Sequence, residues 1–228
     1  MELAIVKVGG SLALYSEKLR NLCVKLNEVS KNHRLIVLPG GGEFADTVRN
    51  LDARFKLSST VSHRMAILGM DQYGFLLSDL LPHSVIINKP ENAQRILDLG
   101  KLPVFLPSHF LFSEDPLENS WDVTSDSIAV YFAGQLHASR VVLVTDVNGV
   151  YTCDPKKFSD AKLISKLSVD ELLNMNMKTS VDKFLPKLLS QLPIECFVVN
   201  GLYPDRIESI LKGQDTVCTI INQQTQMP

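Results

Sequence analysis

A lysine interrupts an apolar run close to the N-terminus. Residues 5–12 read IVKVGGSL, and Lys7 lies between Val6 and Val8 in a segment typical of a buried strand. Burying an ammonium group without a partner costs several kcal/mol, so Lys7 either turns its amine toward solvent or meets an anion. The two glycines and the serine that follow favour an anion such as phosphate, because glycine lets backbone N–H groups approach a ligand closely.

A second glycine-rich turn has the same chemistry. Residues 38–49 read LPGGGEFADTVR, and the three glycines at 40–42 follow a predicted strand and lead into a predicted helix, whose free N–H groups can bind an anion. The stretch matches the dinucleotide pattern G-x-G-x-x-A, but the next predicted strand ends in Asn88 and not in the acidic residue that this pattern requires. A P-loop of the form G-x-x-x-x-G-K-[ST] is also absent. The two glycine turns therefore indicate another way of holding phosphates.

A third group of polar residues lies in 121–155. Asp126 is in the first turn of a predicted helix, where an acid can simply complement the helix dipole. The predicted strand 140–147 ends in Thr145 and Asp146 and is followed by an Asn-Gly turn. The stretch DVNG lacks the carboxylate ladder and the closing glutamate of a calcium loop, so calcium is not expected here.

Taken in order, four motifs resemble the amino acid kinase superfamily over nearly the whole chain: KVGGS, PGGG, TSDSIA and VTDVNGVYTCDP. Within it, residues 62–74, 120–129 and 180–186 are most similar to archaeal [5-(aminomethyl)furan-3-yl]methyl phosphate kinases of methanofuran biosynthesis. The resemblance implies an ATP-dependent kinase that converts a small phosphate monoester to a diphosphate. It also implies that Mg²⁺ is carried by ATP without a protein metal site, and that the chain forms a homo-oligomer.

The resemblance further implies catalytic roles for two lysines and an aspartate. Lys7 would stabilise charge on the transferred phosphoryl group. Lys183 would act on the donor side, although Lys178 or Lys187 could be the true match, and Lys183 could instead be an exposed helix residue. Asp126 would orient the lysines and would not act as a base, because a phosphate acceptor is already ionised.

Binding residues follow from the same resemblance. The nucleotide is expected at Gly9, Gly10, Ser11, Thr145, Asp146, Gly149, Tyr151, Asp154 and Pro155. The acceptor is expected at Gly40, Gly41 and Gly42. A phosphate acceptor needs a further cation, for which Arg64 with His63 is the candidate and Arg49 the alternative, unless these arginines lie on solvated helix faces. Trp121 would either supply an aromatic wall or pack a loop.

The elements that must position these residues alternate along the chain. Strands are predicted at 3–8, 34–39, 84–88, 102–107, 140–147, 194–200 and 216–221, and helices at 16–30, 42–51, 59–80, 91–98, 125–137, 168–174, 181–191 and 204–212. Continuous hydrophobicity in the strands is typical of a sheet covered on both faces. The pattern predicts an α/β fold, a three-layer α/β/α sandwich with a mostly parallel sheet. Segments 108–123 and 152–167 are expected to be irregular loops that cover the site.

Composition narrows the function classes. We expect a single domain over residues 1–228, in which 1–120 mainly bind the acceptor and 121–228 mainly bind the nucleotide. The net charge of −2 and the lack of a basic block make nucleic acid an unexpected partner. No apolar run reaches the roughly 18 residues of a membrane span and no signal-peptide pattern is seen, so a cytoplasmic protein without a membrane partner is expected. The four cysteines lack metal-ligand spacing.

Two further interpretations stay open. One is a kinase of the same fold that acts on isopentenyl phosphate or a nucleoside monophosphate. A furan with a primary amine would need a carboxylate nearby, for which the candidates are Asp71, Glu43 and Asp122. An isoprenoid tail would need an apolar slot. The other interpretation is a non-catalytic nucleotide sensor, which would need affinity but not the residues that favour a transition state.

Overall fold

The computed structural model describes residues 2–175 and 179–223, and it is built on an eight-stranded sheet. In spatial order the strands are β3 (Ser84–Ile87), β4 (Leu102–Phe105), β2 (Arg34–Pro39), β1 (Leu3–Val8), β5 (Arg140–Thr145), β9 (Glu195–Asn200), β10 (Cys218–Asn222) and β8 (Lys166–Ser168). A separate two-stranded sheet pairs β6 (Val150–Tyr151) with β7 (Leu163–Ile164). The predicted α/β fold with a mostly parallel sheet is confirmed.

The order of the strands defines where a ligand can bind. Strands β3, β4, β2, β1, β5 and β9 run parallel to one another, whereas β10 runs antiparallel to β9, and β8 is parallel to β10. After β1 the chain first builds β2 on one side and later β5 on the other side. In open α/β sheets, ligands bind beyond the carboxyl ends of strands at such a reversal of direction. The carboxyl ends of β1, β2 and β5 are therefore the place to look for a site.

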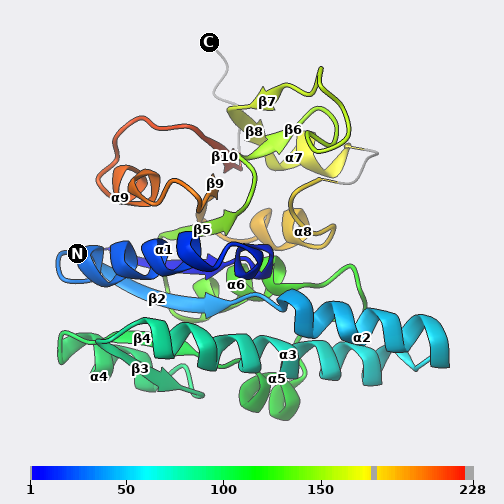
Figure 1. Cartoon of the computed structure of the whole chain (residues 1–228), viewed down its shortest axis with the longest axis horizontal. Coiled ribbons are helices and arrows are strands. Elements are labelled where there is room, and N and C mark those ends of the chain that lie inside the picture. The colour runs from blue at the N-terminus through cyan, green and yellow to red at the C-terminus, as the bar shows by residue number, and fades with distance from the viewer. Residues whose placement is uncertain (1, 176–178, 224–228) are drawn as a thin grey trace.

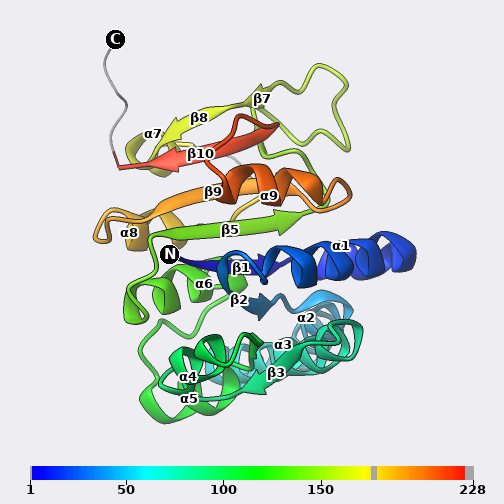
Figure 2. The ribbon, with the colours of Figure 1, turned by 90° about the vertical axis from the view of Figure 1, so that its left-hand side faces the viewer.

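Helices cover both faces of the sheet (Figures 1 and 2). The bounds are η1 (Gly10–Leu14), α1 (Ser16–Val29), α2 (Gly42–Phe55), α3 (Ser59–Leu80), α4 (Asn92–Asp98), α5 (Ser108–Glu114), α6 (Ser125–Gln135), α7 (Val169–Leu173), α8 (Leu185–Leu189) and α9 (Asp205–Leu211). The helices α1 and α9 pack on one face, and α6 and α8 pack on the other. None of the helices in the described ranges is long and apolar enough to cross a membrane.

Strand β1 divides its residues between the two layers. Ala4, Val6 and Val8 belong to the core beneath α1, whereas Ile5 belongs to the core beneath α6. Side chains alternate between the faces of a strand, so Lys7 points to the same side as Ile5, toward α6. Lys7 therefore lies in the layer between β1 and the first turn of α6.

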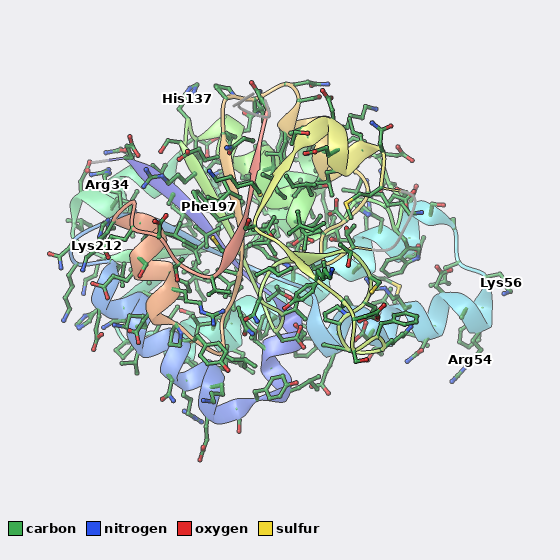
Figure 3. All side chains as sticks on the ribbon, turned by 90° about the horizontal axis from the view of Figure 1, so that it is seen from above. Arg34, Arg54, Lys56, His137, Phe197 and Lys212 are labelled. Carbon is green, nitrogen blue, oxygen red and sulfur yellow. The ribbon has the colours of Figure 1, made fainter. Side chains whose placement is uncertain are left out.

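The helix α2 extends beyond the rest of the chain. It continues past the predicted end at residue 51 to Phe55 and stops at Lys56, whose φ of 54° is left-handed and whose N–H donates to Asp52 O. Figure 3 shows Arg54 and Lys56 at its far end. It runs alongside α3 (Figure 1), so that its first turn lies at the end of β2 and its outer half is free of the sheet.

Several short segments differ from the prediction. Residues 108–123 contain the helix α5, and 152–167 contain β7, although both segments are expected to be irregular. The helix predicted over 181–191 is shorter, because α8 begins only at Leu185. Elements of two to seven residues carry too little periodicity to be recognised from hydrophobic spacing, whereas the long helix predicted at 59–80 matches α3.

Candidate functional site

The two glycine turns pack against each other, backbone to backbone. A Cβ atom on Gly10 would lie 2.1 Å from the Cα atom of Gly42, and one on Gly40 would lie 2.8 Å from the nitrogen of Gly10. The N–H of Gly9 donates to Val144 O at 2.7 Å, which ties the first turn to β5. Side chains cannot be accommodated at these contacts. The glycines therefore bring the ends of β1 and β2 together with the first turn of α2.

Lys7 forms a buried ion pair with Asp126. The distance from Lys7 Nζ to Asp126 Oδ1 is 2.7 Å, and the two side chains are 11% and 9% exposed. The alternative in which Lys7 turns its amine to solvent is therefore wrong. The pairing compensates for the cost of burying two charges, and an ammonium group has three N–H donors, so Lys7 keeps donors for a ligand.

Lys7 and the glycine turns line a cavity of about 330 Å³, which we call the glycine cavity. Among the predicted binding residues, the cavity is lined by Gly9, Gly10, Ser11, Gly41, Gly42, His63, Trp121 and Thr145. Gly40 does not line it but lies beneath it, against the backbone of Gly10. Asp126 does not line the cavity either, but it forms the ion pair with Lys7, which does. The first turn of the 14-residue helix α2 also opens into this cavity, which adds N–H donors to the positive charge of Lys7.

An arginine stacked on tryptophan lines the outer part of the glycine cavity. The guanidinium of Arg49 lies 4.8 Å from the centre of the Trp121 ring and 2.6 Å from Asp46 Oδ1. The Trp121 indole N–H donates to Asp52 Oδ2 at 2.7 Å, which fixes the ring against α2. The cation that lines this cavity from α2 is thus Arg49.

Arg64, the residue expected to bind the acceptor phosphate, lies outside the glycine cavity. Its guanidinium packs over the ring of Phe112 and lies 4.0 Å from Asp115. Arg64 follows directly after His63 on α3, and consecutive helix residues point about 100° apart, so the side chain of Arg64 is turned away from the part of His63 that lines the glycine cavity. Of the two candidate arginines, the structure brings Arg49 and not Arg64 to the glycine cavity.

His63 lines the glycine cavity from α3. Its Nδ1 atom lies 3.2 Å from the backbone oxygen of Ser120, and burial lowers the pKa of the ring. Because a carbonyl oxygen only accepts hydrogen bonds, Nδ1 carries the proton and Nε2 of the neutral ring is an acceptor.

Of the three carboxylates considered for an amine, only Glu43 lines the glycine cavity. Asp71 is turned toward Ser108, which donates to it from both its backbone nitrogen and its hydroxyl group, and burial raises the pKa of Asp71. Asp122 pairs with Lys183. A fourth acid, Asp46, lines the cavity one helical turn after Glu43. It was not among the residues predicted from the sequence. The signal that could have found it is its spacing of three residues from both Glu43 and Arg49, which places the three on one side of a helix.

A second cavity, of about 600 Å³, opens beyond β5, and we call it the β5 cavity. Six predicted nucleotide residues line it: Thr145, Asp146, Gly149, Tyr151, Asp154 and Pro155. Thr145 lines both cavities, so they lie next to each other at the carboxyl end of β5. Lys156 also lines it, and its ammonium group pairs with the buried carboxylate of Asp146. Lys156 was missed in the sequence, where it directly follows the Asp-Pro pair.

The described candidates for a second lysine line neither cavity. Lys183 is 82% exposed and lies 3.3 Å from Asp122, and Lys187 packs over the ring of Phe184. Lys183 faces outward because the preceding residue, Asp182, turns its carboxylate inward toward α6. Lys178 lies outside the described residues. Within the ranges that the structure covers, no cluster of three or more His, Cys, Asp or Glu side chains could hold a metal ion.

Comparisons with known proteins identify the family of this chain. The model of the amino acid kinase family matches residues 2–200. The [5-(aminomethyl)furan-3-yl]methyl phosphate kinase of Methanocaldococcus jannaschii is 35% identical over 217 residues, which cover 95% of this chain and 96% of that protein. The uridylate kinase of Methanococcus aeolicus is 29% identical over 84% of each chain.

Solved structures have the same fold. The uridylate kinase of Archaeoglobus fulgidus superposes with a TM-score of 0.77 at 22% identity, over 97% of this chain and all of that one. The UMP kinase of Bacillus anthracis superposes with a TM-score of 0.79 at 19% identity, over 98% of this chain and 97% of that one. The chain therefore belongs to the amino acid kinase family, and it is a kinase.

Proposed function

We propose that the protein transfers the γ-phosphoryl group of ATP to a small phosphate monoester, and that this acceptor is [5-(aminomethyl)furan-3-yl]methyl phosphate. The observation that carries the proposal is the buried Lys7 ammonium, which is held by Asp126 and lines the glycine cavity, and this cavity shares the wall residue Thr145 with the β5 cavity. An acceptor in the glycine cavity and a nucleotide in the β5 cavity would then face each other across Lys7.

The reaction needs little covalent help from the protein. A phosphate oxygen of the acceptor attacks the γ-phosphorus, a new P–O bond forms, and the bond to the β,γ-bridging oxygen breaks as ADP leaves. The acceptor is already ionised, so no side chain has to remove a proton. Lys7 and the backbone N–H group of Gly10 stabilise the charge on the moving phosphoryl group. Asp126 keeps the ammonium group in position.

Lys156 is the donor-side cation in this proposal. In the structure it pairs with Asp146 at the wall of the β5 cavity. A nucleotide phosphate entering this cavity would compete for the same ammonium group, and Lys156, whose side chain is 58% exposed, has the freedom to change partner. Mg²⁺ arrives with the nucleotide and supplies charge neutralisation at its phosphates.

The wall of the glycine cavity supports an acceptor with a ring and an amine. Trp121 offers an aromatic face. Glu43 and Asp46 offer carboxylates for an ammonium group, and Arg49 lies beside them to bind phosphate oxygens. The 35% identity to the M. jannaschii kinase named for this furan phosphate supports the same acceptor.

Competing acceptors test the proposed specificity. We expect kcat/KM with ATP to be at least about tenfold higher for [5-(aminomethyl)furan-3-yl]methyl phosphate than for UMP or isopentenyl phosphate, because one misplaced group at a site is worth about 1–3 kcal/mol. Glu43→Gln should lower kcat/KM for the furan and leave the rate with isopentenyl phosphate unchanged. A preference for UMP or isopentenyl phosphate would replace the proposed acceptor. ATP binding without turnover of any acceptor would favour the sensor interpretation.

We also propose that the chain forms a homo-oligomer through α3. Val61, Leu68 and Phe75 are exposed and recur every seven residues, which places them on one side of the helix. A second copy of this chain would remove that stripe from water. Light scattering of the wild type should give a multiple of the 25.4 kDa chain mass, and Phe75→Glu should give the monomer. A monomeric wild type would contradict the proposal.

A further inference from the structure

Asp182 accepts hydrogen bonds from three separate residues. Its Oδ2 atom accepts from the Thr124 nitrogen at 2.9 Å, the Thr124 hydroxyl at 2.8 Å and the Ser127 nitrogen at 3.0 Å. Its Oδ1 atom accepts from the Ser127 hydroxyl at 2.5 Å and the Leu185 nitrogen at 2.9 Å. One carboxylate thus holds the beginnings of α6 and α8 together.

The helix α6 depends on this carboxylate because it has no cap of its own. Thr124 is the N-cap residue, but its side chain makes no capping hydrogen bond within the helix. The N–H of Ser127 in the first turn needs an acceptor, and an anion at a helix N-terminus is also favoured by the helix dipole. Asp182, more than fifty residues further along the chain, supplies both the hydrogen-bond acceptor and the negative charge.

Asp126 lies between two of the residues that Asp182 binds. Thr124 and Ser127 flank it on either side in the sequence, so the hydrogen bonds from Asp182 fix the backbone that carries the Asp126 side chain. The Asp126 carboxylate in turn fixes the Lys7 ammonium at 2.7 Å. A displacement of the first turn of α6 would therefore be passed on to Lys7.

The segment that carries Asp182 also contacts the β5 cavity. Thr179 and Ser180 line that cavity, and the Ser180 hydroxyl donates to Gly149 O at 3.0 Å. On the other side of Asp182, the Phe184 nitrogen donates to Asp122 O at 3.2 Å. The segment 179–184 thus connects the wall of the β5 cavity with the beginning of α6.

We propose that Asp182 is a positioning residue for phosphoryl transfer: it aligns the first turn of α6 so that Asp126 holds the Lys7 ammonium at the reacting phosphoryl group. The inference rests on the proposed function, because it assigns Asp182 a role in that reaction. Asp182 itself lines neither cavity and touches no reacting atom.

The charges make this arrangement sensitive to substitution. Burial and the neighbouring Asp126 raise the pKa of Asp182, whereas its hydrogen-bond donors lower it. Three of its partners are backbone N–H groups, which cannot act as acceptors. An asparagine would turn an NH₂ group toward some of these donors, so it would lose hydrogen bonds while keeping the size of the side chain.

The first experiment is steady-state kinetics of Asp182→Asn with ATP and the furan phosphate. We expect kcat to fall about tenfold or more, as for a small misalignment of a catalytic group, while KM for each substrate changes less than about threefold. The control is Ser168→Ala, which removes the capping box of α7 and touches neither Lys7 nor Asp126. It should lower the melting temperature and leave kcat unchanged.

A double-mutant cycle separates positioning from a general loss of stability. If Asp182 acts through Asp126, then adding Asp182→Asn to an Asp126→Asn protein should lower kcat by less than a further factor of about two. The ion pair between Asp126 and Lys7 is already lost in that protein. A purely structural role predicts independent, multiplicative effects and would overturn the inference. So would an unchanged kcat in Asp182→Asn.

A milder variant decides the matter if Asp182→Asn does not fold. Ser127→Ala removes one buried hydroxyl donor and leaves both carboxylates in place. Ser127→Ala should lower kcat, as Asp182→Asn does, and leave KM unchanged. An unaltered kcat would overturn the inference.

A crystal structure tests the inference without activity. In Asp182→Asn, or in Ser127→Ala if the former does not fold, we expect the distance from Lys7 Nζ to Asp126 Oδ1 to exceed about 4 Å, the usual limit of an ion pair. A pair that keeps its 2.7 Å distance would contradict the inference. If the wild type turns over no phosphate acceptor, the proposed function fails, and this structure still tests the positioning role.

Discussion

The Lys7 ammonium lies 2.7 Å from Asp126 Oδ1 at the point where β1 meets the first turn of α6. Both side chains are largely buried, yet Lys7 also lines the glycine cavity. A buried lysine with one carboxylate partner and an open cavity beside it is suited to receive a second anion. The pair is therefore the centre of the proposed reaction.

Removing the Lys7 charge should abolish most of the catalysis. We expect Lys7→Met to lower kcat by about 10²–10³-fold, the usual effect of losing one donor to a transition-state charge. Nucleotide binding, measured by calorimetry, should persist, because the β5 cavity does not include Lys7. The matched control is Lys18→Met on the exposed side of α1, for which kcat should equal that of the wild type. Equal rates in the Lys7 variant would contradict its catalytic role.

Adding one methyl group to the first glycine turn should disrupt the site. In Gly10→Ala the new Cβ would meet the Cα of Gly42 at 2.1 Å, so the two turns must separate. We expect a loss of kcat/KM of at least about 10²-fold, since displacements near 1 Å have this effect. Gly213→Ala is the control, because its Cβ meets no atom within 4 Å although its φ is 68°. It should cost about 1–2 kcal/mol of stability and leave activity unchanged. Similar activities in the two variants would be inconsistent with contact between the turns.

Substitutions of the two arginines should differ in their effect on KM for the acceptor. Arg49→Ala should raise KM for the phosphate acceptor by about tenfold or more, because a charge-assisted hydrogen bond is worth about 1.5–3 kcal/mol. Arg64→Ala should leave that KM within about twofold of the wild type, because Arg64 lies outside the glycine cavity. KM for ATP should be unchanged in both. The reverse pattern would restore Arg64 as the acceptor residue.

The pH dependence of stability should report on His63. Burial lowers the pKa of His63 in the folded state, so the unfolded chain binds the proton at higher pH. As the pH falls below the ordinary value of 6.5, the unfolded state takes up more protons and the free energy of unfolding decreases, until the folded-state pKa is passed. Urea denaturation between about pH 7.5 and pH 5 should show a smaller loss for His63→Gln than for the wild type.

The exposed His83 provides the control for this measurement. The variant His83→Gln should follow the wild-type pH dependence, because His83 is exposed and lacks the burial that affects His63. A wild-type and a His63→Gln curve that run parallel would mean that His63 is protonated equally in the folded and unfolded chain.

Some parts of the site could be predicted because their signal is local. A lysine between buried valines has few options in a parallel sheet, and three successive glycines before a helix exceed what a turn needs. These patterns led to Lys7 and the two turns, which line one cavity. The long helix α3 was found because 22 residues carry enough periodicity.

Other parts depend on contacts between distant segments and have no local signal. The choice between Arg49 and Arg64 is decided by the packing of α2 against Trp121, 72 residues further along the chain than Arg49. The bonds from Asp182 to Thr124 and Ser127 span 58 and 55 residues. Lys183 was predicted from the family resemblance, and its outward direction depends on the inward turn of Asp182, which has no local signal in the sequence.

The most direct test of phosphoryl transfer between the two cavities is ³¹P NMR of the purified protein with Mg-ATP and [5-(aminomethyl)furan-3-yl]methyl phosphate. The account predicts that the monoester signal is replaced by two coupled diphosphate signals while an equal amount of ADP forms, and that Lys7→Met produces neither. ADP accompanied by inorganic phosphate, with the monoester signal unchanged, would contradict it.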